Sequence, residues 1–181
     1  ERLLELAGTD KLTGLGNRMK LAETFTLYAE YAKRHKSPLA VVLFDLDFFK
    51  KINDQHGHHV GDAGLRYIAN FIQARIRKTD LLSRFGGEEF ALLIAGSSEV
   101  NCFKQVDSIR QALADTHFTH DDITLTITVS AGMAMYGKDG DNLEALLLKA
   151  DQRLYQAKDN GRNCVVDANN QQAIEATLQT Q

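Results

Sequence analysis

The chain has 181 residues, of which 44% are apolar and 25% are charged, as in an ordinary globular domain. Its formal net charge of −3, with no basic stripe, argues against a nucleic-acid-binding protein. No apolar run in this sequence approaches the ~20 residues of a membrane span, and we expect no signal peptide. Cys102 and Cys164 lack metal-motif spacing, so we expect two reduced thiols in a cytoplasmic protein.

The sequence begins at ERLLELAGTD without an initiator Met, so we expect a piece of a longer protein. Its apolar residues predict the end of an upstream connecting helix over residues 1–8. We expect the main domain to span residues 9–167 and a polar tail to follow over residues 168–181. The upstream part would hold a sensor domain and leaves room for a membrane anchor.

The first half of the chain predicts a helix, a strand and a second helix. Apolar residues at helical spacing predict a helix over residues 17–34, which Pro38 closes off. Residues 39–47 are apolar throughout and predict a strand that is buried on both faces. A polar loop should follow, and then an amphipathic helix over residues 62–76.

The second half begins with a predicted β-hairpin over residues 80–94. A helix over 97–117 and a strand over 123–135 with one buried face should follow. Asp141 and Glu144 form a capping box that predicts a helix to about residue 160, and NCVVD predicts a short closing strand. This order favours an α/β (α+β) fold with one largely antiparallel sheet flanked by helices.

Asp45 and Asp47 end the most apolar strand of the sequence. Two residues apart in a strand, they should face the same side. Charges at the end of a buried strand need a partner, and Mg²⁺ is a natural one because it prefers carboxylate oxygens. The alternatives are strand-end charges in water, or a helix N-cap at Asp47.

The hairpin supplies a second pair of carboxylates. A two-residue turn at Gly86-Gly87 would place Phe85 opposite Glu88 and Arg84 opposite Glu89. Arg84 and Glu89 would then form an ordinary cross-strand pair. Because adjacent strand residues face opposite sides, the two glutamates should have different roles. The bare glycine backbone would also let a ligand approach closely.

Other motifs are missing or incomplete. There is no GxxxxGK[ST] phosphate loop and no HExxH, and GLGNR (14–18) lacks both the preceding strand and the third glycine of a dinucleotide fingerprint. His56, His58 and His59 are close in sequence, but a solvated loop is favoured over a zinc site.

Four sequence blocks, taken together, are far more specific than any one motif. They are DKLTGLGNR (10–18), FDLDFFKKINDQHGHHVGD (44–62), RFGGEEF (84–90) and DQRLYQAKDNGRN (151–163). In order and spacing they resemble the GGDEF-domain family of diguanylate cyclases. The signature reads GGEEF, with Glu88 in place of Asp; both are carboxylates, so activity is expected.

The resemblance implies a fold and a catalytic centre. The fold should be similar to the palm of nucleotide cyclases and polymerases, with a five-stranded, mainly antiparallel sheet and a hairpin that bears GGEEF. Asp45 and Glu88 match the metal-binding carboxylates, with the backbone carbonyl of Leu46, for Mg²⁺ or possible Mn²⁺. Glu89 matches the position that assists deprotonation of the attacking hydroxyl.

The resemblance also implies the substrate contacts. Asn53 and Asp62 match the residues that read guanine, whose amide edge suits their donors and acceptors. The positions that match phosphate contacts are Lys50, Lys158, Arg162 and the backbone of Phe48 and Phe49. Each has a plainer alternative: Asn53 could form a turn, Asp62 could begin a helix, and the last two cations could favour a helix C-terminus.

Arg77 and Asp80 form an RxxD pair before the GGEEF turn, where the family often places an inhibitory product site. Arg77 would fork onto a guanine or a phosphate, and Asp80 would accept from a guanine. We therefore expect product inhibition through this pair, although RxxD also occurs by chance.

The implied function is the condensation of two GTP molecules into cyclic di-GMP and two pyrophosphates. One domain holds one GTP, so a homodimer is expected to bring two sites together. The alternatives are a catalytically silent module that binds GTP or cyclic di-GMP, a structural dimerisation domain, or a cyclase with another product.

Overall fold

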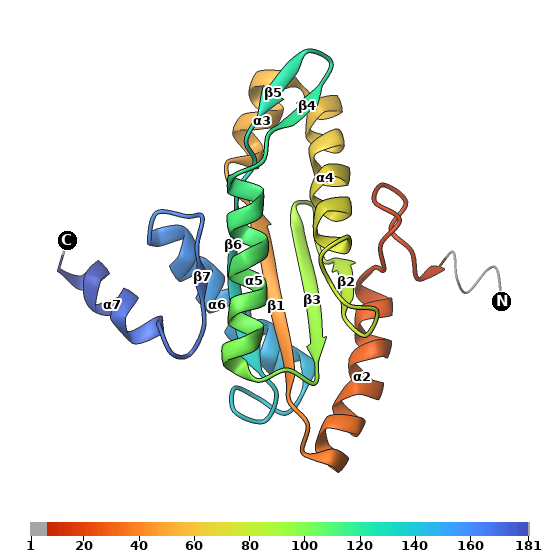
Figure 1. Ribbon diagram of the computed structural model, residues 1–181, viewed down its shortest axis with the longest axis vertical. Coiled ribbons are helices and arrows are strands. Elements are labelled where there is room, and N and C mark those ends of the chain that lie inside the picture. The colour runs from red at the N-terminus through yellow and green to blue at the C-terminus, as the bar shows by residue number, and fades with distance from the viewer. Residues whose placement is uncertain (1–6, 181) are drawn as a thin grey trace.

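The computed structural model describes residues 7–180, so nearly all of the helix expected over residues 1–8 lies outside the described residues. The centre of the fold is a five-stranded sheet with the order β2-β3-β1-β6-β7 (Figure 1). The neighbours are antiparallel except β6 and β7, which are parallel. The strands are β1 (Leu39–Leu46), β2 (Leu81–Arg84), β3 (Glu89–Ala95), β6 (Val129–Met135) and β7 (Val165–Val166).

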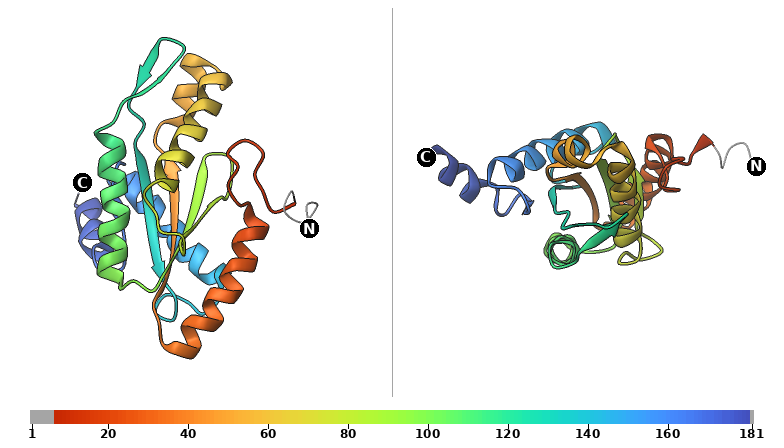
Figure 2. Two further views of the ribbon diagram at one scale, coloured as in Figure 1. Left: turned by 45° about the vertical axis from the view of Figure 1, so that its right-hand side comes forward. Right: turned by 90° about the horizontal axis from the view of Figure 1, so that it is seen from above.

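Helices cover both faces of this sheet (Figure 2). On one face, α4 (His58–Gln73) and α5 (Glu99–Ala114) enclose the larger core. On the other face, α2 (Arg18–His35) and α6 (Leu143–Asp159) enclose the smaller one. The short α3 (Phe49–His56) joins β1 to α4, and α7 (Gln171–Gln179) lies near the C-terminus. Within residues 7–180, no helix is long and apolar enough to cross a membrane.

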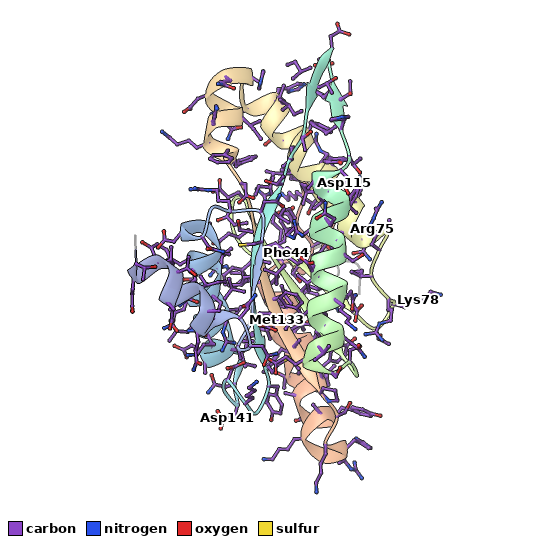
Figure 3. All side chains as sticks on the ribbon, turned by 60° about the vertical axis from the view of Figure 1, so that its left-hand side comes forward. Phe44, Arg75, Lys78, Asp115, Met133 and Asp141 are labelled. Carbon is purple, nitrogen blue, oxygen red and sulfur yellow. The ribbon has the colours of Figure 1, made fainter. Side chains whose placement is uncertain are left out.

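Strand β1 is buried along its whole length, as its apolar run predicts. Its even-numbered residues, from Ala40 to Leu46, point into the α4/α5 core, and Leu39, Val41 and Leu43 point toward α2 and α6. The strand alternation therefore places Asp45 on the α2/α6 side. Figure 3 shows Phe44 and Met133 inside the molecule and the labelled charged residues pointing outward.

The prediction of a polar loop after β1 is wrong, because α3 occupies residues 49–56 and α4 already begins at His58. Gly57 separates the two helices and has a φ of 86°, a left-handed conformation that glycine adopts without strain. Helix α3 has no fully buried residue, and only Phe49 and Ile52, one turn apart, pack partly against the core, so its apolar pattern was too short to predict a helix. His56, His58 and His59 consequently lie in helices rather than in a loop.

The single strand expected over residues 123–135 is interrupted. Residues Ile123–Leu125 form β5, which pairs with β4 (Phe118–His120) in a separate hairpin, and the chain enters the central sheet only at Val129. The expected alternation of buried and exposed residues ends there, because every residue of β6 is buried. Helix α6 covers the second face of β6, and this covering helix is what a strand pattern alone does not reveal.

The expected hairpin register and one expected cap are also wrong. Arg84 pairs with Phe90 instead of Glu89, so the loop is longer than two residues. Neither central glycine has the positive φ that a two-residue hairpin turn needs. The Glu89 carbonyl instead accepts from the N–H groups of Phe85 (2.8 Å) and Gly86 (3.2 Å). Helix α6 is capped by Asn142, whose side chain accepts from the Ala145 N–H, and not by the box of Asp141 and Glu144.

Candidate active site

Three carboxylates converge where β1 ends and β3 begins. Asp45 and Glu89 are directly opposite in the β1–β3 ladder, so their side chains leave the sheet on the same side. Glu88 precedes β3, and its carbonyl accepts from the Leu46 N–H at 3.3 Å. Its carboxyl group faces that of Asp45, whose negative charge helps to raise the Glu88 pKa. The expectation that Glu88 and Glu89 face opposite sides is wrong, because only Glu89 belongs to the strand.

One cation enters this group from α6. Lys158 Nζ lies 2.5 Å from Asp45 Oδ2, and the Asp45 side chain is almost fully buried. Burial raises the pKa of Asp45, Lys158 lowers it, and Asp47 raises it again, with a net increase. One lysine therefore does not offset the cost of placing Asp45 in this pocket.

The two glutamates have raised pKa values for the same reasons. Burial is the largest cause for Glu88, followed by the negative charge of Asp45. Burial also leads for Glu89, whose pKa is raised further by Asp45 and Asp151 and lowered by Lys158 and Arg18. These three carboxylates, of which Asp45 is buried and the glutamates are half-buried, are short of positive charge, and carboxylate oxygens are the ligands that Mg²⁺ prefers. The donor set thus fits a hard divalent cation.

Asp47 has a different environment from Asp45. It is 4% exposed, and it accepts from Ser130 Oγ (2.6 Å), Thr128 Oγ1 (2.8 Å) and the Asn163 N–H (3.0 Å). It is neither a charge in water nor the cap of α3, whose N-cap residue is Phe48. Asp47 instead joins the end of β1 to β6 and to the loop that follows α6.

Two arginines hold the GGEEF loop, a role that the sequence alone predicts for neither. Arg84 donates from Nη2 to the Gly87 carbonyl at 2.7 Å and forms an ion pair with Asp10 at 3.2 Å. Arg18, in the first turn of α2, donates to the Phe85 carbonyl at 2.6 Å and stacks over the Phe85 ring. A Cβ at Gly86 would lie 3.1 Å from a Glu89 carboxylate oxygen, so this glycine makes room for Glu89.

Positive groups gather at the N-terminus of α3. Phe48 has a left-handed backbone and provides no side-chain cap, so the first N–H groups of α3 have no side-chain acceptor. Exposed Lys50 lies in the first turn and is 3.7 Å from Asp54. Arg162, in the loop after α6, places its guanidinium 4.8 Å from the centre of the Phe48 ring. A helix N-terminus flanked by cations suits a phosphate group, and Phe49 follows Phe48 as its first residue.

Asn53 and Asp62 come from consecutive helices, α3 and α4, and neither begins a turn or a helix. Asn53 packs so closely on α4 that a Cβ at Gly61 would lie 1.8 Å from its Oδ1 atom. That Oδ1 atom is buried and has no hydrogen-bond partner among the described residues 7–180. An unpaired buried acceptor is costly, so this position is suited to a ligand that donates a hydrogen bond.

Arg77 and Asp80 lie together, but Asp80 is turned inward. The Asp80 side chain is fully buried, and its Oδ2 atom accepts from the Arg77 N–H and from Gln105 Nε2, both at 3.0 Å. The half-exposed Arg77 side chain donates to Ser97 Oγ at 2.7 Å. Arg77 is therefore the accessible member of the pair, and Asp80 holds its backbone in place.

Comparison with known proteins identifies the family of this site. The family model described as "Diguanylate cyclase, GGDEF domain" matches residues 7–164. The chain belongs to the GGDEF-domain family of diguanylate cyclases. It is 40% identical over 165 residues to the response regulator PleD of Caulobacter vibrioides, a match that covers 90% of this chain and 36% of PleD. The chain therefore spans about a third of the length of that relative.

Solved structures of GGDEF domains share this fold. A coiled-coil and GGDEF structure of DgcB from Caulobacter crescentus, in complex with c-di-GMP, has a TM-score of 0.86 at 27% identity. The match covers 92% of this chain and 88% of that one. The active GGEEF domain of a diguanylate cyclase from Vibrio cholerae has a TM-score of 0.78 at 34% identity, covering 84% and 97% of the two chains. The five-stranded, mainly antiparallel sheet expected from the sequence is thus confirmed.

Proposed function

We propose that this chain is a diguanylate cyclase that condenses two GTP molecules into cyclic di-GMP and two pyrophosphates. The observation that carries the proposal is the convergence of Asp45, Glu88 and Glu89, all with raised pKa values, beside Lys158. The phosphate-binding character of the α3 N-terminus and the unpaired Asn53 oxygen support the same substrate.

Asp45, Glu88 and the backbone carbonyl of Leu46 are the groups proposed to hold Mg²⁺ or Mn²⁺. The bound ion supplies positive charge that offsets the carboxylates and shields the phosphates of the substrate. The excess of carboxylates over cations is the feature of this chain that fits such an ion.

The chain's own groups would bind and orient the nucleotide. Lys158, Arg162 and Lys50 would contact the triphosphate, together with the backbone N–H groups at Phe48 and Phe49. Asn53 and Asp62 would hydrogen-bond the amide edge of guanine. The exposed Gly87 leaves the loop backbone open to the ligand.

The reaction forms a bond between the 3′ oxygen of one GTP and the α-phosphorus of the other. The bond from that phosphorus to the bridging oxygen breaks, and pyrophosphate leaves. Glu89 would accept the 3′-hydroxyl proton, because a carboxylate with a raised pKa is a better base near neutral pH. A second, symmetric step closes the ring, so two domains must face each other in a homodimer.

The test is to incubate the protein with GTP and Mg²⁺ and to identify the products by chromatography and mass spectrometry. We expect cyclic di-GMP from the wild type and none from Glu88→Ala. A second form of the protein carries a dimerising coiled coil fused to its N-terminus. If only this fused form makes product, the unfused domain lacks dimerisation and not catalysis. No product from that fused dimer would refute the cyclase and leave a silent nucleotide-binding module.

The Arg77–Asp80 pair is proposed as part of an inhibitory site for the product. Arg77 offers an exposed guanidinium that Asp80 positions through the backbone. Upstream sensor segments would set how two catalytic domains meet, and the expected cytoplasmic location follows from the use of GTP.

A further inference from the structure

A second group of ligand-type side chains lies where the β4–β5 hairpin meets the first turn of α4 (Figure 1). It consists of His59 in α4, His120 at the end of β4 and Asp121 in the hairpin turn. One nitrogen or oxygen atom from each lies within 4.8 Å of the other two. The sequence separates His59 from His120 by about sixty positions, so only the fold brings them together.

The hairpin turn fixes Asp121 next to His120. His120 pairs with Ile123, and the two residues between them, Asp121 and Asp122, have φ angles of 47° and 64°. Two positive φ values in a two-residue loop are the requirement of a tight β-hairpin turn. In this turn, His120 Nε2 lies 3.4 Å from Asp121 Oδ2.

Aromatic packing fixes the hairpin against α4. Phe118 of β4 stacks on Tyr67 of α4, with ring centres 4.8 Å apart. His120 lies on the same side of β4 as Phe118, and the two rings are nearly parallel, with an interplanar angle of 7°. The His59 and His120 rings are then 5.9 Å apart. Packing against Phe118 therefore orients the His120 imidazole, while the exposed His59 side chain has room to rotate toward it.

His120 Nε2 lacks the partner that a buried nitrogen needs. The atom is buried and makes no hydrogen bond in the structure, since its contact with Asp121 has the distance of an ion pair without hydrogen-bond geometry. A buried polar atom without a partner costs free energy, and a native chain seldom leaves one unused.

We propose that His59, His120 and Asp121 bind a divalent transition-metal ion of the Zn²⁺ class. Two imidazoles and a carboxylate are ligands that Zn²⁺ accepts, and Mg²⁺ is bound mainly by oxygen. Tetrahedral coordination at about 2.0–2.1 Å per bond places ligand atoms roughly 3.4 Å apart, so side-chain rotations close the present cluster around an ion. Water would complete the coordination sphere at this exposed end of the molecule.

The bound ion would tie the hairpin to α4 close to the guanine site. Asp62 lies three residues after His59, within the next turn of α4. The site is separate from the Asp45 and Glu88 carboxylates, and its existence does not depend on the cyclase reaction.

The test is calorimetric titration of the protein with ZnCl₂ in excess MgCl₂, so that Mg²⁺ competes for the carboxylates. We expect one Zn²⁺ per chain for the wild type and affinity at least about 10-fold weaker for His59→Gln and His120→Gln. His58→Gln is the matched control, because His58 is an exposed neighbour outside the cluster, and it should bind like the wild type. Equal binding by His120→Gln, or no stoichiometric binding by the wild type, would overturn the proposal.

A second measurement identifies the ligands directly. Zinc X-ray absorption of the complex should show two imidazole ligands, and one or none would refute this site. Glu88→Ala should keep the same affinity for Zn²⁺, which separates this proposal from the cyclase. Loss of zinc binding in Glu88→Ala would instead assign the ion to the carboxylates.

Discussion

Replacing Gly61 with alanine should impair GTP binding without damaging the fold. The added Cβ would lie 1.8 Å from Oδ1 and 2.9 Å from Cγ of Asn53, the residue proposed to read guanine. No backbone atom lies among its nearest contacts, and the next atom is at the end of the Phe49 side chain, at 3.4 Å. The Asn53 amide must therefore move away, and α4 itself need not.

Gly61→Ala should have opposite effects on folding stability and on GTP affinity. In a helix interior alanine is about 0.8–1.0 kcal/mol more favourable than glycine, and displacing Asn53 breaks no hydrogen bond at its unpaired Oδ1. For a domain of this size, 1 kcal/mol corresponds to about 2–4 °C, so Tm should stay equal or rise by up to that amount. Loss of one hydrogen bond to guanine costs about 1–1.5 kcal/mol, or roughly 5- to 15-fold in GTP affinity.

The assay combines thermal unfolding with GTP affinity measured by calorimetry. Gly64→Ala is the matched control, because it changes the same buried helix and meets only Ile127 Cδ1, at 3.1 Å. We expect both variants to keep their Tm and only Gly61→Ala to lose affinity. Unchanged GTP affinity in Gly61→Ala would refute the proposed orientation of Asn53, and a fall in Tm of several degrees would refute the packing argument.

Three further substitutions test the electrostatics. Asp139→Asn leaves the buried Arg153 guanidinium without its 2.9 Å ion-pair partner, so thermal unfolding should show a loss of about 3–5 kcal/mol. Burial raises the pKa of Asp139, but the hydrogen bonds from Arg153 and the Met135 N–H outweigh burial, so the net pKa is lowered. The stabilisation by this ion pair should therefore be complete above pH ~4 and be lost as the pH falls through the lowered pKa. Because the pKa of Glu88 is raised in the folded protein, ionising Glu88 costs stability, and this cost grows as the pH rises through the raised pKa. Glu88→Gln removes that charge, so without metal it should have a higher Tm than the wild type at pH 7. The same variant should form no cyclic di-GMP. Arg77→Ala should need more added cyclic di-GMP for half-inhibition of initial rates; an unchanged value would remove Arg77 from the inhibitory site.

The strongly patterned elements of the fold could be predicted from the sequence. The continuous apolar run of β1 and the helical spacing in α2 leave few alternatives, and the helix predicted from residue 97 is α5, whose N-cap is Ser98. The predictions failed where neighbours outside the segment decide the structure. Helix α3 has no buried residue to mark its period, and the burial of β6 on both faces depends on α6 lying across it.

The candidate site could be predicted as a set of residues but not as a geometry. Glu88 and Glu89 were expected on opposite sides, because alternation was assumed to extend through the loop. The loop carbonyls accept from Arg84 and Arg18, so the hairpin turn is wider than its two glycines suggest. Asp47 was paired with Asp45 as one reading of a Mg²⁺ site, beside a solvated charge and a helix N-cap, and only the hydroxyls that surround it show its structural role.

The contacts among the four sequence blocks explain why those blocks occur together. Arg84 in the third block pairs with Asp10 in the first, and Asn163 in the fourth donates to Asp47 in the second. Lys158 of the fourth block also reaches Asp45 of the second. The first two contacts join a loop to the sheet or to the end of β1, and the third joins α6 to the end of β1. Gathering three carboxylates in one pocket opposes folding, and these charged anchors hold the pocket together until a cation offsets that cost.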